Sequence, residues 1–395
     1  MQPTEAPPVV ESELFDSIQR DLERDGPAKA VDRLCDELSE AKDYSKLFYA
    51  MLMKKRLAMG VSPIPTAPSN ELTPAQQDEY ETAIREAART VGGLFLEAGR
   101  IPMAFDYFRM IGEMAPIADA IAKYAPPEEE DVQPIIEIAF HHGVNPKKGF
   151  DLVLDRYGIC SAITFASGGF DPALPSEIKQ HCIGRLVRSL HDQLIERLSM
   201  EIERQQGFAP NAKSIPELIS GRDWLFADDS YYTDTSHLSS VVQMSVELEP
   251  GDDMRLAREL CAYGQKLSPQ LQYPGNPPFE NLYRDVDAYL GVLLGDDVDA
   301  GIEHFKAKIE ADPDGPDAFT AAVVVKLLVR VGRKQDALSV ARKYLAKEDT
   351  RQLPCPGAME LASQLGDYEA FAEVARERDD PVHFLAGLIE AKKTK

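Results

Sequence analysis

The segment SYYTDTSHLSSVVQMSV, residues 230–246, places tyrosines, acids, hydroxyls and a histidine directly before an apolar run. Histidine, tyrosine and aspartate are side chains that general acid–base chemistry uses, and a helix N-terminus offers N–H groups to an anion. Tyr231, Asp234 and His237 would therefore form a small polar site if they faced a cleft. The same residue types also suit the start of a helix, and both interpretations stay open.

Helix initiation explains part of this segment without any chemistry. Asp234 and Thr235 are both good N-cap residues, and His237 would lie in the first turn, where it can cap or pack. Apolar residues follow at helical spacing, at Leu238, Val241, Val242 and Leu248. We therefore predict a helix that begins at Asp234 or Thr235.

The preceding loop contains the sequence RDWLF, residues 222–226, with the only tryptophan. Large aromatic side chains usually bury, so Trp224 and Phe226 are expected to plug the loop against the helices. Arg222, Tyr231 and Tyr232 are the better candidates for an exposed recognition surface, because arginine and tyrosine carry much interface energy.

A long helix is predicted over residues 176–206, and its polar face carries charges of both signs. Such a face is usually solvated, but Arg185 and Arg188 would receive a carboxylate if they lay in a groove. The candidate partner-binding residues are therefore Arg185, Arg188, Arg222, Tyr231, Tyr232 and His237.

Histidines give no recognisable metal motif. His141 and His142 are adjacent near the end of a predicted helix, where neighbouring side chains point about 100° apart and chelate poorly. A site would need His181, His191 or His237 brought close by folding, and no H-E-x-x-H spacing exists. We assign no catalytic residue, metal or cofactor. The alternative is a hydrolase-like or metal-dependent enzyme with a site near His181, Tyr231 and His237.

Helical periodicity dominates the rest of the chain, and no period-2 strand pattern appears. Thr73, Pro74 and Gln76 have the spacing of a capping box at a helix start. Proline-bearing stretches at 61–70 and 125–134 are predicted loops, and the stretch 160–175, which also has paired glycines, is predicted as a loop or short helix. The fold class expected is all-α.

Four places repeat a glycine followed closely by an alanine: Gly99 and Ala104, Gly295 and Ala300, Gly332 and Ala337, Gly366 and Ala370. Glycine ends one helix in a left-handed turn, and the small alanine lets the next helix approach its partner. We expect Ala300 and Ala337 to be buried between helices.

The last three glycines are 37 and 34 residues apart, and this spacing with the glycine-to-alanine pattern resembles the tetratricopeptide repeat. The resemblance is best over residues 280–378, weaker over 85–155 and absent over 160–275, and no tryptophan occupies the repeats. It implies a right-handed α-solenoid of helical hairpins whose concave surface binds peptides or helices of a partner.

The expected domain organisation follows these patterns. An N-terminal helical segment precedes a helical-hairpin region, which is followed by a loop-rich segment with helices and by the tetratricopeptide-like repeats. The boundaries are 1–60, 71–206, 207–278 and 279–395.

The composition of the chain limits which classes of partner and which cellular compartments we expect. A net charge of −23 disfavours nucleic acid and anionic membranes, and it leaves room for a basic partner. The five cysteines form no C-x-x-C pair, so neither disulfides nor zinc is indicated. The first residues lack the basic and apolar regions of a signal peptide, and no apolar run reaches the ~18 residues of a membrane span. We expect a cytoplasmic interaction scaffold for a protein or peptide, rather than an enzyme, and leave its oligomeric state open.

Overall fold

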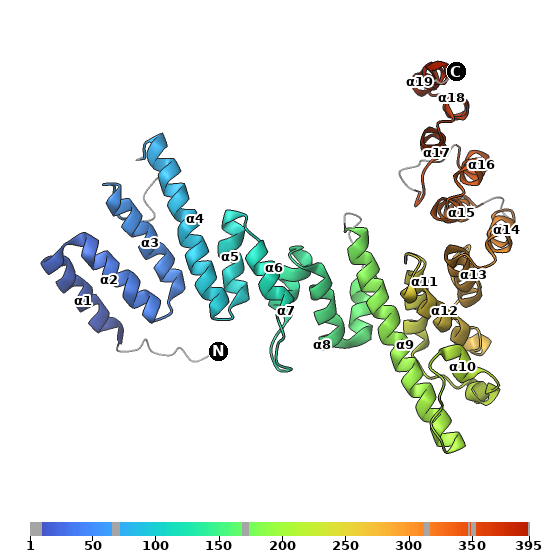
Figure 1. The fold of residues 1–395 in the computed structure, drawn as a ribbon, viewed down its shortest axis with the longest axis horizontal. Coiled ribbons are helices and arrows are strands. Elements are labelled where there is room, and N and C mark those ends of the chain that lie inside the picture. The colour runs from blue at the N-terminus through green and yellow to red at the C-terminus, as the bar shows by residue number, and fades with distance from the viewer. Residues whose placement is uncertain are drawn as a thin grey trace. The chain divides into compact units, whose positions relative to one another are not determined.

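The computed structural model describes residues 10–64, 72–167, 174–311, 317–346, 348 and 353–393. Every regular element within these ranges is a helix, and no strand occurs among them (Figure 1). The all-α prediction is therefore confirmed. Part of the predicted loop at 61–70 and the middle of the predicted loop at 160–175 lie outside the described residues.

The chain divides into two compact units, unit 1 over Met1–Arg156 and unit 2 over Tyr157–Lys395. The predicted region 71–206 spans the boundary between the two units, and the four-part division stays a prediction. Helix α8 (Pro146–Ser167) crosses the boundary and is interrupted at Gly158, whose φ of 77° is left-handed. Residues 160–167, predicted as loop or short helix, continue that helix beyond the break.

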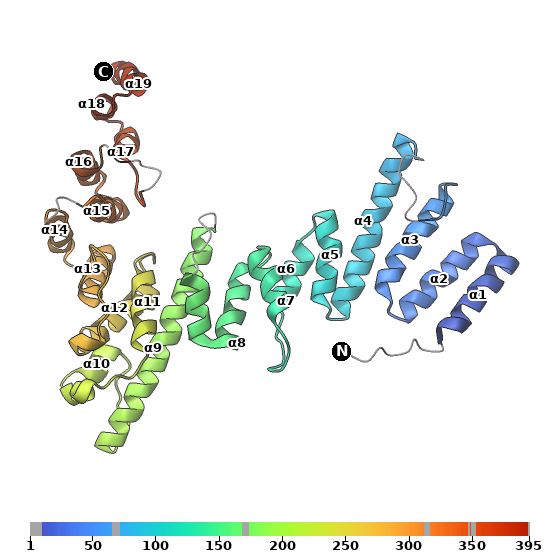
Figure 2. The ribbon, with the colours of Figure 1, turned by 180° about the vertical axis from the view of Figure 1, so that it is seen from behind.

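In unit 1 each helix packs against its neighbour in the sequence, from α1 on α2 through α4 on α5. The reverse view shows the same order of helices (Figure 2). The capping box predicted at Thr73 is present, with Gln76 as its reciprocal partner. The helices are α1 (Val10–Asp25), α2 (Pro27–Glu40), α3 (Tyr44–Ala58), α4 (Pro74–Glu97), α5 (Ile101–Ile111), α6 (Ala115–Ala122) and α7 (Gln133–Ile136), which runs into a π-helical turn over Glu137–His141.

Unit 2 contains the long helix α9, whose apolar stripe is buried against α10, α11 and α12. From α12 onward each helix again packs against the next one along the chain. The helices are α9 (Ser176–Gln206), α10 (Ile215–Ile219), α11 (Thr235–Ser245), α12 (Asp252–Gly264), α13 (Leu282–Leu294), α14 (Val298–Ile309), α15 (Ala318–Arg330), α16 (Lys334–Leu345), α17 (Ala358–Leu365), α18 (Tyr368–Glu377) and α19 (Pro381–Lys393).

The glycine-to-alanine pattern has the predicted structure in three of its four copies. Each of these turns has its glycine in the left-handed region, at Gly99, Gly332 and Gly366. The alanines that follow are buried against the preceding helix, at Ala104, Ala337 and Ala370.

The fourth copy was predicted wrongly, because Ala300 is exposed. Its turn contains an additional residue: after Gly295 the chain passes through Asp297, whose φ is 46°, before α14 begins. The close approach therefore falls one position later, at Gly301. A Cβ at Gly301 would lie 2.2 Å from Val292 Cγ2, so only glycine fits there.

Within the part of the chain that the structure describes, no helix combines the length and the apolar character needed to cross a membrane.

Candidate partner-binding groove

The segment that opens α11 is a helix cap. Asp234 Oδ1 accepts the backbone N–H groups of Ser236 at 2.8 Å and His237 at 3.2 Å. The Ser236 hydroxyl also donates to it, and these bonds hold the pKa of Asp234 below its usual range. Asp234 is thus the N-cap, and Thr235 is the first helical residue. His237 is half-buried in that first turn.

Arg222 is a half-buried residue whose guanidinium serves the fold. Its Nη1 donates to the carbonyl oxygens of Glu217 at 3.2 Å and Leu218 at 2.8 Å. These carbonyls lie in the short helix α10, whose C-terminal end leaves them without intrahelical donors. The arginine that sequence analysis selected for recognition therefore has internal partners.

The expectation that Trp224 and Phe226 both bury is wrong for Trp224. Trp224 is exposed, whereas its neighbour Leu225 is fully buried. The 3₁₀ turn over Asp223–Asp229 directs Leu225 inward and leaves Trp224 at the surface. Phe226 is half-buried and packs against Tyr263, with the ring centroids 5.5 Å apart.

Tyr231 and Tyr232 differ in their surroundings. Tyr231 is 56% exposed. Tyr232 is half-buried, its N–H donates to the Tyr263 hydroxyl at 2.7 Å, and its carbonyl accepts from Arg197 at 3.1 Å. Both tyrosines line an open hollow of about 450 Å³ beside α9. Of the six candidate residues, only these two line that hollow.

Arg188 binds a carboxylate of its own chain. Its Nε and Nη2 donate to Asp253 Oδ1 and Oδ2 at 2.6 and 2.8 Å, a bidentate pair between α9 and α12. Asp253 lies so close to α9 that a Cβ at Gly184 would come within 2.3 Å of its oxygen. The carboxylate predicted to bind Arg188 therefore belongs to the same chain. Arg185 is half-buried on the same helix.

The histidines do not gather into a metal site. Buried His191 has Nε2 2.9 Å from Glu259 Oε2, which also accepts the Ile215 N–H at 2.8 Å. This arrangement ties α9, α10 and α12 together. His181 and His237 are half-buried, and His141 and His142 are exposed in unit 1. Across the described ranges, no three His, Cys, Asp or Glu side chains come together as metal ligands.

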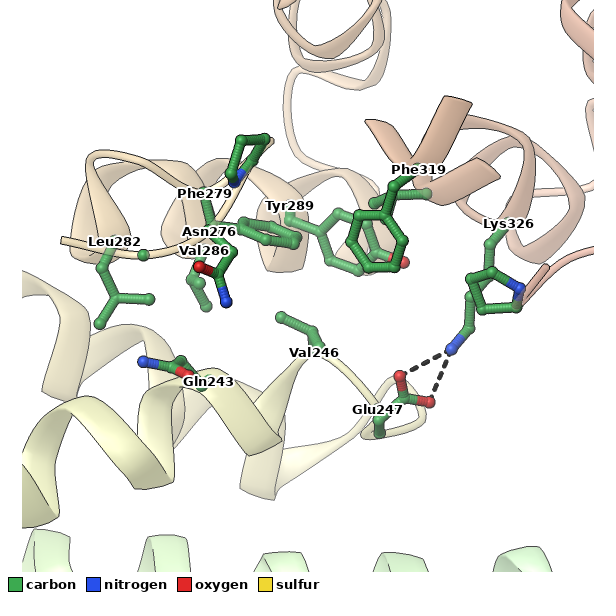
Figure 3. A pocket seen from close by; sticks show the side chains of 14 residues that line it. Gln243, Val246, Glu247, Asn276, Phe279, Leu282, Val286, Tyr289, Phe319 and Lys326 are labelled. Carbon is green, nitrogen blue, oxygen red and sulfur yellow. Dashed lines mark hydrogen bonds and ion pairs between the residues drawn. The ribbon is translucent and has the colours of Figure 1, made fainter. Parts of the chain in front are cut away.

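Unit 2 contains a different hollow, an apolar groove of about 250 Å³ that sequence analysis did not identify (Figure 3). It lies between the end of α11, the loop before α13, α13 itself and α15. We call it the α11–α13–α15 groove. Its lining residues are Gln243, Val246, Glu247, Gly275, Asn276, Pro277, Phe279, Leu282, Val286, Tyr289, Phe319, Val323, Lys326 and Pro354.

Aromatic rings form one wall of the groove. Phe279 and Tyr289 meet edge to face with centroids 5.6 Å apart, and Tyr289 packs in the same way on Phe305. Burial raises the pKa of Tyr289 to about 12. Phe319, beside this wall in Figure 3, is 52% exposed. The groove therefore joins a rigid aromatic wall to a phenyl ring that remains open to solvent.

The loop before α13 forms part of the lining of the groove. A Cβ at Gly275 would lie 2.1 Å from the Phe279 carbonyl oxygen, so the turn needs glycine. The Phe279 N–H donates to the Asn276 carbonyl at 2.7 Å and fixes the turn. In Figure 3 the Asn276 and Gln243 amides extend into the groove from opposite sides.

An ion pair closes the other end. Lys326 Nζ donates to both carboxylate oxygens of Glu247 at 2.7 Å. Arg330 donates to the carbonyls of Val246, at 2.6 Å, and Leu248, and so fixes the turn that follows α11. Glu247 remains half exposed, so this ion pair stands at the rim of the groove.

These residues carried little signal in the sequence. Leu282, Val286 and Tyr289 follow one another at helical spacing, and such a stripe is equally typical of a buried core. The loop sequence GNPPFEN, residues 275–281, was the available clue, because an aromatic among turn residues is unusual in a plain connection.

No protein-family model, no curated protein and no solved structure matches this chain.

Proposed function

We propose that this chain is a protein–protein interaction scaffold that holds a linear segment of a partner in the α11–α13–α15 groove. The observation that carries the proposal is the groove itself, which has an aromatic wall, a phenyl ring half open to solvent and amides extending from both sides. Peptide-binding surfaces commonly combine apolar pockets for side chains with polar groups for the main chain.

The packing order supports a solenoid of helical hairpins as the framework, and its tetratricopeptide-like, right-handed form is proposed from the resemblance of the sequence. Helix α13 contacts both α11 and α15, while α12 and α14 intervene in the sequence. Alternate helices that touch one another in this way are expected where helical hairpins stack. The three helices that line the groove would then belong to the inner, concave layer.

The groove suits a segment with an apolar or aromatic side chain followed by a basic residue. The apolar side chain would fill the space beside Phe279 and Phe319. The basic residue would share the half-exposed Glu247 carboxylate with Lys326, and the net charge of −23 would attract such a segment. We place this function in the cytoplasm.

Quantitative affinity capture with matched variants tests the proposal. Phe319→Arg puts a positive charge in the groove, and Tyr49→Arg changes an aromatic residue of similar exposure in unit 1. We expect a set of proteins to bind the original chain and Tyr49→Arg but not Phe319→Arg. Synthetic peptides from those proteins should then bind directly in a fluorescence-anisotropy titration. Equal capture by all three forms would contradict the proposal.

The six residues selected from the sequence belong to a second, weaker proposal for the partner surface. Of these, Tyr231 has the exposure that a contact residue needs. The hydrolase-like alternative near His181, Tyr231 and His237 is not advanced, because no observation in the described residues favours it.

A further inference from the structure

Helix α19 is apolar on two faces, and only one of them is covered by residues that the structure describes. On the covered face, Gly387 packs so closely on α18 that a Cβ there would lie 2.8 Å from the Phe371 ring. The other face is open to solvent over four apolar side chains. Their exposed fractions are 74% for Val382, 59% for Leu385, 40% for Leu388 and 47% for Ile389.

The spacing of these side chains is that of a helix-packing seam. Val382, Leu385 and Ile389 occupy positions i, i+3 and i+7, so they lie in one stripe along the helix. Single exposed apolar residues are ordinary on a protein surface, but a continuous stripe of this kind marks a surface that another helix covers.

The charges at the two ends of the stripe indicate which helix fits. Asp379 lies just outside the helix, in the left-handed turn before Pro381, and Lys392 stands three residues after Ile389 within the helix. Asp380 adds a second acid at the N-terminal end, where its carboxylate accepts the Val382 N–H at 3.1 Å. The helix is therefore acidic at its start and basic at its end, and it complements an antiparallel copy of itself.

We propose that α19 pairs with α19 of a second copy of this chain, antiparallel about a two-fold axis. In the register that places Val382 opposite Ile389, the turn that carries Asp379 lies next to Lys392 of the other copy, and Leu385 lies beside its own counterpart at the axis. Such an isologous contact covers the exposed stripe of both copies, so the assembly is complete at two chains. The antiparallel arrangement also sets the positive end of each helix dipole against the negative end of the other.

The contact is short, so the dimer forms only at sufficient protein concentration. Thirteen residues span about 20 Å of helix, which places the interface at the small end of specific contacts. The α11–α13–α15 groove has no part in this contact. A test of the dimer therefore does not test the proposed function of the groove.

Sedimentation velocity on the full chain tests the pairing, over about 1 to 100 µM, where small interfaces dissociate. The original chain should pass from monomer to dimer in this range, and Leu385→Lys should remain monomeric. Phe15→Lys is the matched control, because Phe15 is a 68% exposed apolar residue of α1. It should dimerise like the original chain. A monomeric original chain would overturn the proposal, and so would loss of dimer in Phe15→Lys, which would indicate head-to-tail contacts.

A charge exchange tests the register. Asp379→Lys and Lys392→Glu should each weaken the dimer at least tenfold in dissociation constant, because each places like charges opposite one another. The two changes combined in one chain should restore it. Position 379 has a φ of 55°, and Lys42 already occupies a φ of 57° in this chain, so lysine suits the site. Failure of the combined variant to dimerise, with circular dichroism showing an intact fold, would contradict the antiparallel register.

Discussion

Segment 222–237 and the α11–α13–α15 groove, both in unit 2, differ in their amino-acid types and in what their side chains contact. The segment 222–237 contains side-chain types that are common in catalytic and partner-binding sites. Its Arg222 and Asp234 nevertheless form their hydrogen bonds with backbone groups at helix ends. The α11–α13–α15 groove is built from ordinary apolar residues, yet it leaves a phenyl ring half exposed. Polar composition here marks the ends of helices, and the binding surface arises where stacked helices leave space between them.

The physical reason lies in the number of unsatisfied backbone groups. Short elements such as α10 and the 3₁₀ turn after it have many free N–H and carbonyl groups for their length, and polar side chains satisfy them. Long helices satisfy their own backbone, so their side chains remain available for packing or for a partner. Predictions that separate stability from binding therefore test this comparison.

The largest expected effect is on the free energy of unfolding of Arg222→Ala. Removing the guanidinium leaves two carbonyls of α10 without a donor, which costs about 1–3 kcal/mol. Chemical denaturation should show this loss, whereas exposed Arg255→Ala should change little. Affinity for a groove-binding peptide should be unchanged. A peptide that bound Arg222→Ala much more weakly would make the segment part of the binding site.

Phe319→Ala should show the opposite pattern. Its ring is half exposed, so the free energy of unfolding should change by less than about 0.5 kcal/mol. Peptide binding should weaken by about 2 kcal/mol, roughly thirtyfold in dissociation constant, because the ring is the accessible aromatic of the groove. Calorimetric titration beside thermal unfolding measures both quantities. A large stability loss with unchanged affinity would make Phe319 a core residue.

The two regions each begin a helix with an aspartate cap, which allows a closer comparison. Asp317 accepts the Thr320 N–H at 2.7 Å at the start of α15, two residues before Phe319. Asp234→Ala and Asp317→Ala should each cost about 0.5–2 kcal/mol of stability. Only Asp317→Ala should also weaken peptide binding, because it loosens the turn that carries Phe319. Equal affinities in the two variants would contradict the role of that turn.

The cap at Asp234 should also respond to pH. The hydroxyl of Ser236 and the backbone N–H groups lower the pKa of this carboxylate from an ordinary value of 3.8. A lowered folded-state pKa means that the stabilisation is complete above the ordinary value and is lost as pH falls through the folded value. The difference in unfolding free energy between the original chain and Asp234→Ala should therefore be constant above about pH 5 and shrink below pH 4. A difference that grew on acidification would contradict this sign.

Sequence alone predicted the helices well, because their signals are local. The long helix 176–206, the cap at Asp234 and the turn at Gly332 depend on residues within a few positions of one another. The burial of particular side chains was less predictable. One additional turn residue moved the close approach from Ala300 to Gly301, and Trp224 is exposed although large aromatics usually bury.

The groove could not be predicted because it depends on distances between helices. Phe279, Tyr289 and Phe319 come from a loop and two helices, and nothing in their local sequence states that a space remains among them. A core stripe and a groove lining have the same helical period. Tertiary packing decides between the two, and a sequence pattern does not contain it.

The smallest expected effect belongs to Tyr231→Ala. Tyr231 is 56% exposed beside α9, and the nearby Arg204 is already paired with Glu201 at 2.6 Å. Removing the side chain therefore removes few stabilising contacts, and the free energy of unfolding should change by less than about 0.5 kcal/mol. Peptide affinity at the groove should also be unchanged, because Tyr231 does not line it. Affinity capture provides the decisive measurement. A protein that Tyr231→Ala no longer captures and Phe319→Ala still captures would show that segment 222–237 has a partner of its own. The two regions would then both bind partners and would differ in which partner each one binds.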